Sequence, residues 1–404
     1  MSNNWNVVPF TEAVDICDTF RKPINSSERA SRIKGKEQSE LYPYYGATGQ
    51  VGFIDDYITD GEYVLLGEDG APFLDAFSSK AYIISGKTWV NNHAHVLRSK
   101  TNNKFLCYYL NSFNYKGYVS GTTRLKLTQA EMKRIPVPVP PLSEQERIVS
   151  RIEELFSQLD AGVETLKKTK AQLAVYRQAV LKEAFEGRLT QAFREENGLP
   201  DWKTISITQA IVQRKNALKA GPFGSALKKE CYVPSGYKVY GQEQVIANNE
   251  NIGNYYIDEE KYQELISCAI APHDILISLV GTVGKVLVLS DNCLPGTINP
   301  RLIKVTLDEK IMMPYFFKYY FESAYLKSLY KKKAHGATMD VLNMGMIKEL
   351  PFPLCDIQEQ GQVIKEIESR LSVCDSIEHT VGLALQQAEA MRQSIFKDAF
   401  DGKL

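Results

Sequence analysis

The sequence lacks the features that would place the chain in a membrane or cross-link it with disulfides. No window approaches about 18 uninterrupted apolar residues, so no membrane span is predicted. The N-terminal residues carry no basic flank before an apolar run, so no signal peptide is predicted either. The seven cysteines form no Cys-x-x-Cys pair. This pattern indicates reduced thiols in a cytoplasmic protein rather than a disulfide framework or a zinc site.

The chain also lacks the common catalytic and nucleotide-binding motifs. Residues 281–286 come nearest to a phosphate-binding loop. Their two glycines are too close together, and valine follows the lysine where the motif requires serine or threonine. Asn299-Pro300-Arg301 stops short of the Asn/Asp-Pro-Pro-aromatic motif of an amino-methyltransferase. Neither His-Glu-x-x-His nor Gly-x-Ser-x-Gly occurs. These absences argue against an enzyme that acts by itself.

Two closely spaced histidines, His93 and His95, allow two interpretations. They could be metal ligands, or they could lie on one face of a strand. No cysteine or acidic residue stands near them at metal-ligand spacing, so the strand is favoured and no metal site is predicted.

The chain as a whole has no excess of either charge. It contains 48 Lys plus Arg and 48 Asp plus Glu, which excludes a DNA-binding protein that relies on bulk positive charge. The charges are distributed unevenly, however. Residues 1–142 and 199–356 each carry about +2, residues 143–190 are neutral, and residues 357–404 carry −3. Two mildly basic modules are therefore predicted, and neither should bind DNA tightly without a partner.

One segment of the chain occurs twice. Residues 133–189 superpose on residues 348–404 without a gap, and 18 of the 57 positions are identical. Each copy begins with a proline-rich string that leads to Glu-Gln, IPVPVPPLSEQ in the first and LPFPLCDIQEQ in the second. A weaker similarity precedes the copies, where FLCYYLNS at 105–112 matches FFKYYFES at 316–323. The sequence thus predicts two modules that alternate with two equivalent segments.

The repeated segments show the heptad periodicity of long helices. Their strongest apolar seam positions, seven residues or a multiple of seven apart, are Ile152, Leu159, Leu166, Leu173 and Val180 in the first copy and Ile367, Val381 and Ile395 in the second. The first copy often carries leucine where the second carries alanine or cysteine. This difference favours two helices of one chain that pack against each other. The alternative is two separate amphipathic helices, each packed on its own module.

These patterns together predict an α+β chain. Two globular, β-rich α/β domains would be separated by two long antiparallel helices that form a coiled coil, giving a dumbbell with approximate two-fold symmetry. The predicted boundaries are residues 1–142 for module A, 143–190 for the first repeated helix, 191–198 for a linker, 199–356 for module B and 357–404 for the second repeated helix. The modules are predicted to be β-rich because short apolar runs alternate with Gly, Asn and Asp.

Several strings of the sequence are shared with a known family. The most specific are IPVPVPPLSEQERIV at 135–149 and its copy LPFPLCDIQEQGQVI at 350–364. Supporting strings are YPYYGATGQVGFIDDYI at 42–58, GPFGSALK at 221–228, and DILISLVGTVGKVLVLS followed by INPRL within 274–302. With two β-rich modules and two repeated helices, the whole chain resembles the specificity subunit of a type I restriction–modification system. The second copy departs from the first at Cys355-Asp356-Ile357 and at Arg370 within its seam.

The resemblance implies a non-catalytic DNA-recognition subunit. Each module would be a target recognition domain that reads one half of an asymmetric, bipartite sequence in double-stranded DNA. The helices would act as a spacer ruler and as the docking site for two modification subunits, which methylate adenine N6 with S-adenosylmethionine. Restriction subunits would use ATP and Mg²⁺, so no cofactor is expected in this chain. The rival hypothesis is a coiled-coil scaffold whose globular modules bind proteins.

Candidate contact residues are taken from the basic clusters and the repeated polar positions of this sequence, and the resemblance assigns no base contact to any of them. Basic clusters that flank a repeated Gly-x-Thr are expected to lie near DNA: Arg124, Lys126, Lys331, Lys332, Lys333 and His335. Polar residues repeated in the two helical segments are expected at the interface with partner helices: Glu144, Gln145, Arg177, Glu359, Gln360 and Arg392. For both groups the alternative is an ordinary solvated surface.

Overall fold

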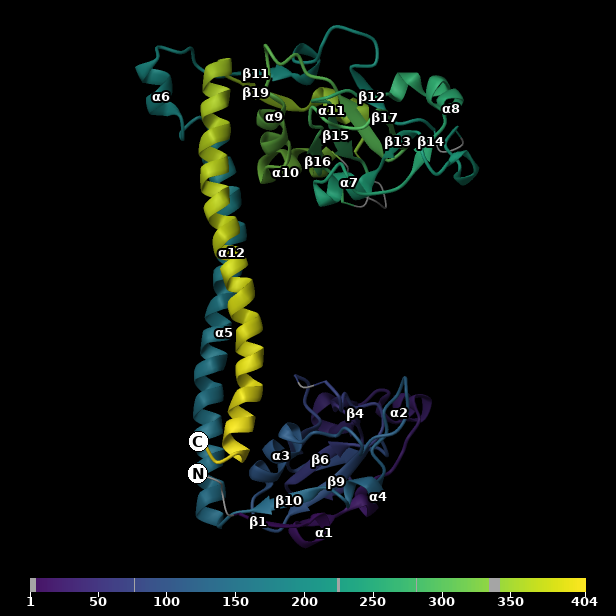
Figure 1. Cartoon of the computed structure of the whole chain (residues 1–404), viewed down its shortest axis with the longest axis vertical. Coiled ribbons are helices and arrows are strands. Elements are labelled where there is room, and N and C mark those ends of the chain that lie inside the picture. The colour runs from purple at the N-terminus through teal and green to yellow at the C-terminus, as the bar shows by residue number, and fades with distance from the viewer. Residues whose placement is uncertain (1–4, 76, 224–225, 281, 334–341) are drawn as a thin grey trace. The chain divides into compact units, whose positions relative to one another are not determined.

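The computed structural model describes residues 5–75, 77–223, 226–280, 282–333 and 342–404, and these form two compact units (Figure 1). The first unit combines Met1–Thr169 with Thr380–Leu404, and the second is Lys170–His379. Each unit holds one globular module and part of each long helix. The boundary between the units therefore runs through the helices rather than between a helix and its module.

Two four-stranded sheets build the module of the first unit. One is antiparallel with the order β2-β9-β6-β7, and the other has the order β4-β3-β8-β5 with β3 and β8 parallel. A separate pair, β1 with β10, joins the start of the module to the residues that precede the first long helix. The strands are β1 (Asn6–Pro9), β2 (Val14–Ile16), β3 (Tyr42–Gly46), β4 (Gly49–Ile54), β5 (Thr59–Asp60), β6 (Tyr63–Gly67), β7 (Ala81–Ile84), β8 (Lys87–Val90), β9 (Ala94–Ser99) and β10 (Pro136–Val139).

Short helices pack on the two sheets of the first unit. They are α1 (Phe10–Ala13), α2 (Ser26–Ile33), α3 (Asn103–Ser112) and α4 (Gln129–Met132). Helix α3 packs on β6 and β7 through the buried Leu106 and Leu110. It begins at Asn103 because the Asn102 side chain accepts a hydrogen bond from the N–H of Phe105. Strand β6 is buried along its whole length, as its continuous apolar sequence predicts.

The second unit repeats this topology with shorter strands. Its antiparallel sheet has the order β12-β18-β15-β16, its second sheet has the order β14-β13-β17 with β13 and β17 parallel, and β11 pairs with β19. The strands are β11 (Lys203–Ser206), β12 (Leu218–Ala220), β13 (Tyr237–Tyr240), β14 (Tyr256–Ile257), β15 (Ile275–Ser278), β16 (Val286–Val288), β17 (Gly296–Ile298), β18 (Leu302–Val305) and β19 (Pro351–Leu354). The helices are α6 (Gln191–Glu196), α7 (Gln242–Ala247), α8 (Glu259–Glu264), α9 (Pro314–Phe321), α10 (Ala324–Lys333) and α11 (Met344–Glu349). The first of these helices lies in the stretch predicted to be the linker.

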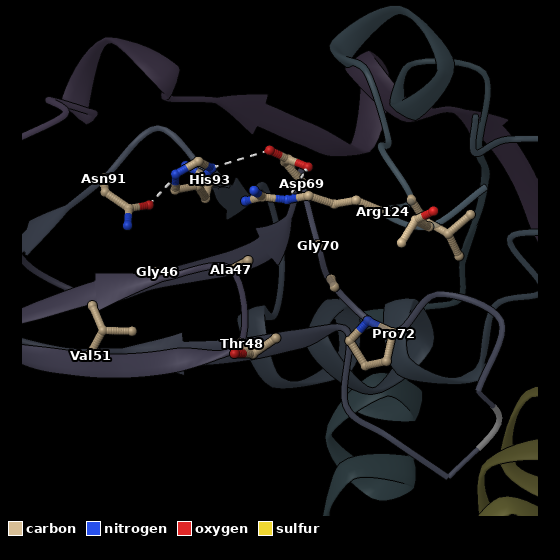
Figure 2. Close-up of a pocket in the computed structure, with 13 residues that line it drawn as sticks. Gly46, Ala47, Thr48, Val51, Asp69, Gly70, Pro72, Asn91, His93 and Arg124 are labelled. Atoms are coloured by element: carbon tan, nitrogen blue, oxygen red, sulfur yellow. Dashed lines mark hydrogen bonds and ion pairs between the residues drawn. The ribbon is translucent and has the colours of Figure 1, made fainter. Parts of the chain in front are cut away.

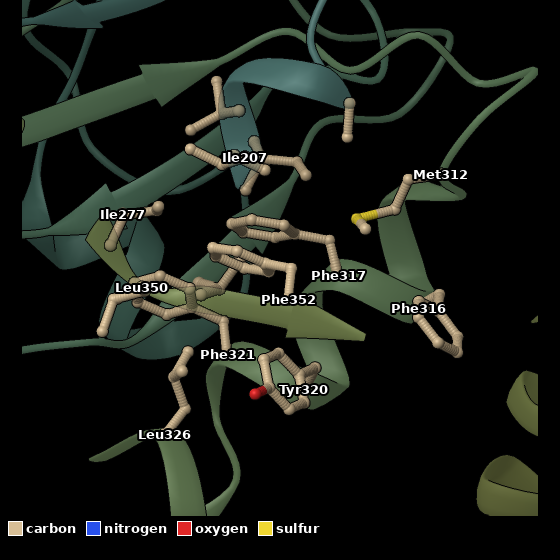
Figure 3. Packing of buried hydrophobic residues seen from close by; sticks show 14 of the residues in the cluster. Ile207, Ile277, Met312, Phe316, Phe317, Tyr320, Phe321, Leu326, Leu350 and Phe352 are labelled. Carbon is tan, nitrogen blue, oxygen red and sulfur yellow. The ribbon is translucent and has the colours of Figure 1, made fainter. Parts of the chain in front are cut away.

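Aromatic rings fill the centre of the second unit (Figure 3). Phe317, Phe321 and Phe352 are fully buried, and the ring centroids of Phe317 and Phe352 lie 5.2 Å apart with an interplanar angle of 11°. Tyr320 lies beside them and donates its hydroxyl to the carbonyl of Pro351 over 2.9 Å. These contacts fix α9 against β19, the strand that leads into the second long helix.

The two repeated segments are helices of equal length, α5 (Leu142–Phe185) and α12 (Ile357–Phe400), each of 44 residues. Each is followed by a glycine with φ +71°, Gly187 and Gly402, in the left-handed conformation that closes a helix C-terminus. In the first unit Arg147 donates to the carbonyl of Leu404, and Asp160 pairs with Arg392. Residues later in α5 thus contact residues earlier in α12. The helices are antiparallel, and the predicted α+β class is confirmed.

The heptad seam is buried mainly at one set of positions. Among the predicted seam residues, Ile152, Leu173, Val180, Ile367, Val381 and Ile395 are buried, whereas Leu159 and Leu166 are partly buried. Tyr176, Ile377 and Met391, each of which lies four residues before one of these seam residues, remain exposed. Some apolar side chains of both helices are therefore left uncovered by the partner helix.

Candidate nucleic-acid interface

A surface hollow of about 710 Å³ lies where the two sheets of the first unit meet. Its floor is main chain at Gly46, Ala47 and Gly70, and its polar wall is formed by Asn91, His93, Asp69 and Arg124 (Figure 2). Gly46 permits this close packing, because a Cβ at this position would lie 3.3 Å from the Asn91 amide nitrogen and 3.2 Å from Val51. The hollow thus presents peptide groups and a few directed polar side chains.

Asn91 and His93 form a tight turn between β8 and β9. The Asn91 side-chain oxygen accepts the N–H of His93 over 2.8 Å, and the N–H of Asn91 donates to the carbonyl of Tyr45 over 3.0 Å. The imidazole of His93 lies 3.5 Å from the Asp69 carboxylate, which also pairs with Arg124 at 2.8 Å. The side chains of His93 and Arg124 are 40% and 60% exposed, respectively. Hydrogen bonds hold the backbone of the turn, while the imidazole and the guanidinium stay accessible to solvent.

A network of buried and half-buried ionisable groups supports this wall from below. Asp18 accepts hydrogen bonds from the His95 imidazole at 2.8 Å, from the N–H of Val96 at 2.9 Å and from the Gln129 amide at 3.0 Å. Arg21 connects Asp18 to Glu68, which in turn lies 3.5 Å from Lys126. Burial opposes the ionisation of Asp18, but the hydrogen bonds outweigh it and hold the pKa of this carboxyl below its usual value.

The second unit contains the same turn with different side chains. Asn299, which follows β17, accepts the N–H of Arg301 on its side-chain oxygen over 2.9 Å, and its own N–H donates to the carbonyl of Tyr240 over 2.9 Å. Asn299 therefore corresponds to Asn91, and Arg301 corresponds to His93. Arg301 is exposed, and its guanidinium reaches the Gln242 amide oxygen only at 3.5 Å.

A comparison with known protein families identifies the family of the chain. The model of the type I restriction modification DNA specificity domain matches residues 4–174 and 223–386. The chain belongs to this family. It is 27% identical over 389 residues to a Haemophilus influenzae protein provisionally named a type I restriction enzyme specificity subunit, covering 94% of this chain and 91% of that protein. It is 24% identical over 396 residues to the EcoBI specificity subunit of Escherichia coli, covering 92% and 79%.

Solved structures share the fold of this specificity subunit. A chain from a type I restriction–modification system superposes with a TM-score of 0.70 at 14% identity, over 100% of both chains. The specificity subunit from Thermoanaerobacter tengcongensis superposes with a TM-score of 0.56 at 14% identity, over 100% of this chain and 98% of that one. Members of the family recognise DNA, assemble with other subunits of the system and are not catalytic, because catalysis resides in the partner subunits.

Of the residues predicted to lie near DNA, two line or adjoin the hollow. Arg124 lines it. Lys126 lies at its edge, where its backbone forms isolated β-bridges with Asp69 and Ser120. Lys331, Lys332 and Lys333 end helix α10, and His335 lies outside the described residues. The structure therefore brings Arg124 and Lys126 together with His93, a residue that the sequence did not single out as a DNA contact.

The six predicted interface residues of the helices make contacts within the specificity subunit. Gln145 and Gln360 are buried, and each donates its amide to the carbonyl five residues earlier, Pro140 at 2.8 Å and Cys355 at 3.0 Å. Glu144 forms two hydrogen bonds with Arg147, and the buried Glu359 accepts from Thr190 over 2.7 Å. The two glutamines and Glu359 fasten the beginning of each helix to the residues around it, whereas Glu144 pairs within its own helix.

The remaining two interface residues tie the helices together. Arg177 pairs with Asp375 at 2.6 Å in the second unit, and Arg392 pairs with Asp160 in the first. Arg177 and Asp160 recur in the sequence repeat as Arg392 and Asp375, so one ion pair is formed twice, with the roles of the helices exchanged.

The strand interpretation of the two histidines is right for one of them. His95 lies on β9 and is fully buried, whereas His93 lies in the turn before that strand. The sequence contained a signal for this turn, since both modules have an apolar run, then asparagine, then a basic residue two positions later. Within the described residues, no helix is long and apolar enough to cross a membrane, and no three acidic, histidine or cysteine side chains gather to hold a metal ion.

The D18N substitution is expected to destabilise the first unit by about 1–3 kcal/mol at pH 7, because buried donors lose a charged acceptor. The folded pKa of Asp18 lies below its unfolded value of about 3.9. Its contribution is therefore present above that value and is lost as the pH falls through the folded pKa. Denaturant unfolding at pH 7, 5 and 3.5 should show the difference from wild type shrinking at the lowest pH. The control is D60N at an exposed aspartate; a difference that is independent of pH would contradict the argument.

Proposed function

We propose that this specificity subunit reads an asymmetric, bipartite sequence in double-stranded DNA, with one globular module for each half. The observation that carries this proposal is the shared turn, which presents His93 in the first unit and Arg301 in the second. Two modules that share the backbone of this turn but present different side chains suit two different half-sites. Each module carries only about +2, so phosphate contacts from partner subunits would supply much of the affinity.

The paired helices would serve as ruler and docking surface. At about 1.5 Å per residue, 44 residues extend about 66 Å, which is close to two turns of DNA. Apolar side chains that α5 and α12 leave exposed are Val175, Tyr176, Val373, Ile377, Leu383 and Met391. Apolar surface that a fold leaves exposed is typical of protein interfaces. Two modification subunits would dock here.

The chemistry would reside in the partners, all acting in the cytoplasm. The modification subunits would methylate adenine N6 with S-adenosylmethionine, and restriction subunits would translocate and cleave DNA with ATP and Mg²⁺. This chain would direct both activities to the target by holding the complex on it. Arg124 and Lys126, exposed at the edge of the hollow, would contact the DNA backbone.

Methylome sequencing of a host with and without the gene tests the proposal. We expect an asymmetric, gapped N6-methyladenine motif to disappear when the gene is deleted and to return with a plasmid copy. The matched control is a plasmid copy of the gene truncated before α12, which should not restore the motif. A methylome that stays unchanged on deletion would favour the coiled-coil scaffold with protein-binding modules.

A further inference from the structure

The turn that carries His93 and Arg301 is held by the same three hydrogen bonds in both units. Besides the two bonds made by each asparagine, the carbonyl of His93 accepts the N–H of Glu68 over 2.8 Å, and the carbonyl of Arg301 accepts the N–H of Leu279 over 3.0 Å. In each module the basic residue is therefore held through both its N–H and its carbonyl. Its backbone position is determined by the central strands rather than by a free loop.

A glycine packs closely against the asparagine side chain of each turn. A Cβ on Gly46 would lie 3.3 Å from the side-chain nitrogen of Asn91, and a Cβ on Gly241 would lie 2.8 Å from the side-chain nitrogen of Asn299. Both glycines directly follow the residue whose carbonyl binds the asparagine N–H, Tyr45 and Tyr240. Two modules of dissimilar sequence thus retain the same close packing around one side chain.

The side chain at this position is free to meet a ligand. The side chain of His93 is 40% exposed, and its imidazole lies 3.5 Å from the Asp69 carboxylate. Arg301 is exposed and meets Gln242 at the outer limit of hydrogen bonding. A rigid backbone with an accessible donor is what directional recognition requires, since a base edge must be met at a defined angle. A phosphate contact, by contrast, tolerates long and mobile side chains.

We propose that His93 and Arg301 are the specificity-determining residues at one equivalent base-reading position of the two modules. Arg301 donates to O6 and N7 of a guanine in one half-site, and His93 donates to a purine N7 in the other. The inference rests on the proposed function and adds which side chains distinguish the two half-sites. Arginine is the side chain whose planar fork matches the guanine edge, so the residue at this position sets the base preference.

The test is the methylation motif produced by H93A, R301A and the exchange variant H93R, each expressed with its modification subunits in a host that lacks the motif. H93A should relax discrimination by roughly 10- to 100-fold at one position of one half-site, and R301A should do so at one position of the other. H93R should introduce a guanine preference in its own half-site, a gain that a misfolded variant cannot produce. K116A and K310A, at exposed lysines of the first and second unit, are the matched controls and should leave the motif unchanged.

The outcomes separate this inference from the proposed function. An unchanged motif in all three variants would overturn the base-reading role, as would an equal decrease at all sites without altered preference, which indicates a phosphate contact. In either case the wild-type motif would still support the proposed function. If the wild-type complex produced no gapped motif, the proposed function itself would fail.

Discussion

Replacing Phe352 with alanine is expected to destabilise the second unit by about 3–5 kcal/mol, the usual cost of removing a large aromatic side chain from a packed core. The ring is fully buried and lies within 5.2 Å of Phe317, 5.6 Å of Tyr320 and 6.4 Å of Phe321, measured between ring centroids. Its neighbours on α9 cannot close the cavity without leaving β16, on which α9 packs. A domain typically has a stability of only about 5–15 kcal/mol, so this loss is a large share of the total.

Hydrogen exchange measured by mass spectrometry localises this effect. Peptides from β15 and α9 of the F352A variant should exchange faster, whereas peptides from β6 and β9 of the first unit should keep their protection. Y325A is the matched control, because this aromatic side chain of the same unit is 58% exposed, and it should change the unfolding free energy by about 0.5 kcal/mol or less. A loss under about 1 kcal/mol for F352A would contradict the packing described.

The long helices could be predicted closely because both signals that define them are local. Heptad spacing and a gapless repeat gave 143–190 and 357–404, and the structure has Leu142–Phe185 and Ile357–Phe400. Burial of the heptad positions could not be predicted to the same degree. Tyr176 and Met391 fit the apolar pattern yet are 45% and 54% exposed. An apolar heptad position shows that a side chain can be buried, but whether it is buried depends on the packing of the partner helix.

The candidate site was predicted only in part because its contacts join distant parts of the chain. Arg124 and Lys126 stood out as a basic cluster, and both lie at the hollow. The partners that support the hollow are far away in sequence, as with Asp18 and His95, which are 77 residues apart. The parallel pairing of β3 with β8, which places Asn91 beside Gly46, likewise leaves no local signature. The proposed role of His93 also depends on a turn that nonlocal strand pairing forms in each unit.

Inserting one heptad into each long helix is expected to lengthen the spacer of the recognised DNA and to leave the bases of both half-sites unchanged. Suitable places are between Thr169 and Lys170 and between His379 and Thr380, where the boundary between the compact units crosses α5 and α12. Seven residues lengthen a helix by about 10.5 Å, which corresponds to about three base pairs at 3.4 Å each. A seven-residue insertion preserves the heptad phase, so the seam on either side of it can still form.

Methylome sequencing should then show a motif whose gap is about three base pairs longer, with the bases of both half-sites retained. The matched control is a five-residue insertion at the same two places, which turns each helix face by about 140° and should abolish methylation because the seam cannot form. Methylation by the heptad variant at the original spacing would contradict the ruler, since the readers would then be positioned by something other than the helices. A changed base in either half-site would contradict it too, because the insertions leave β3, β8, β13 and β17 and the turns they carry untouched.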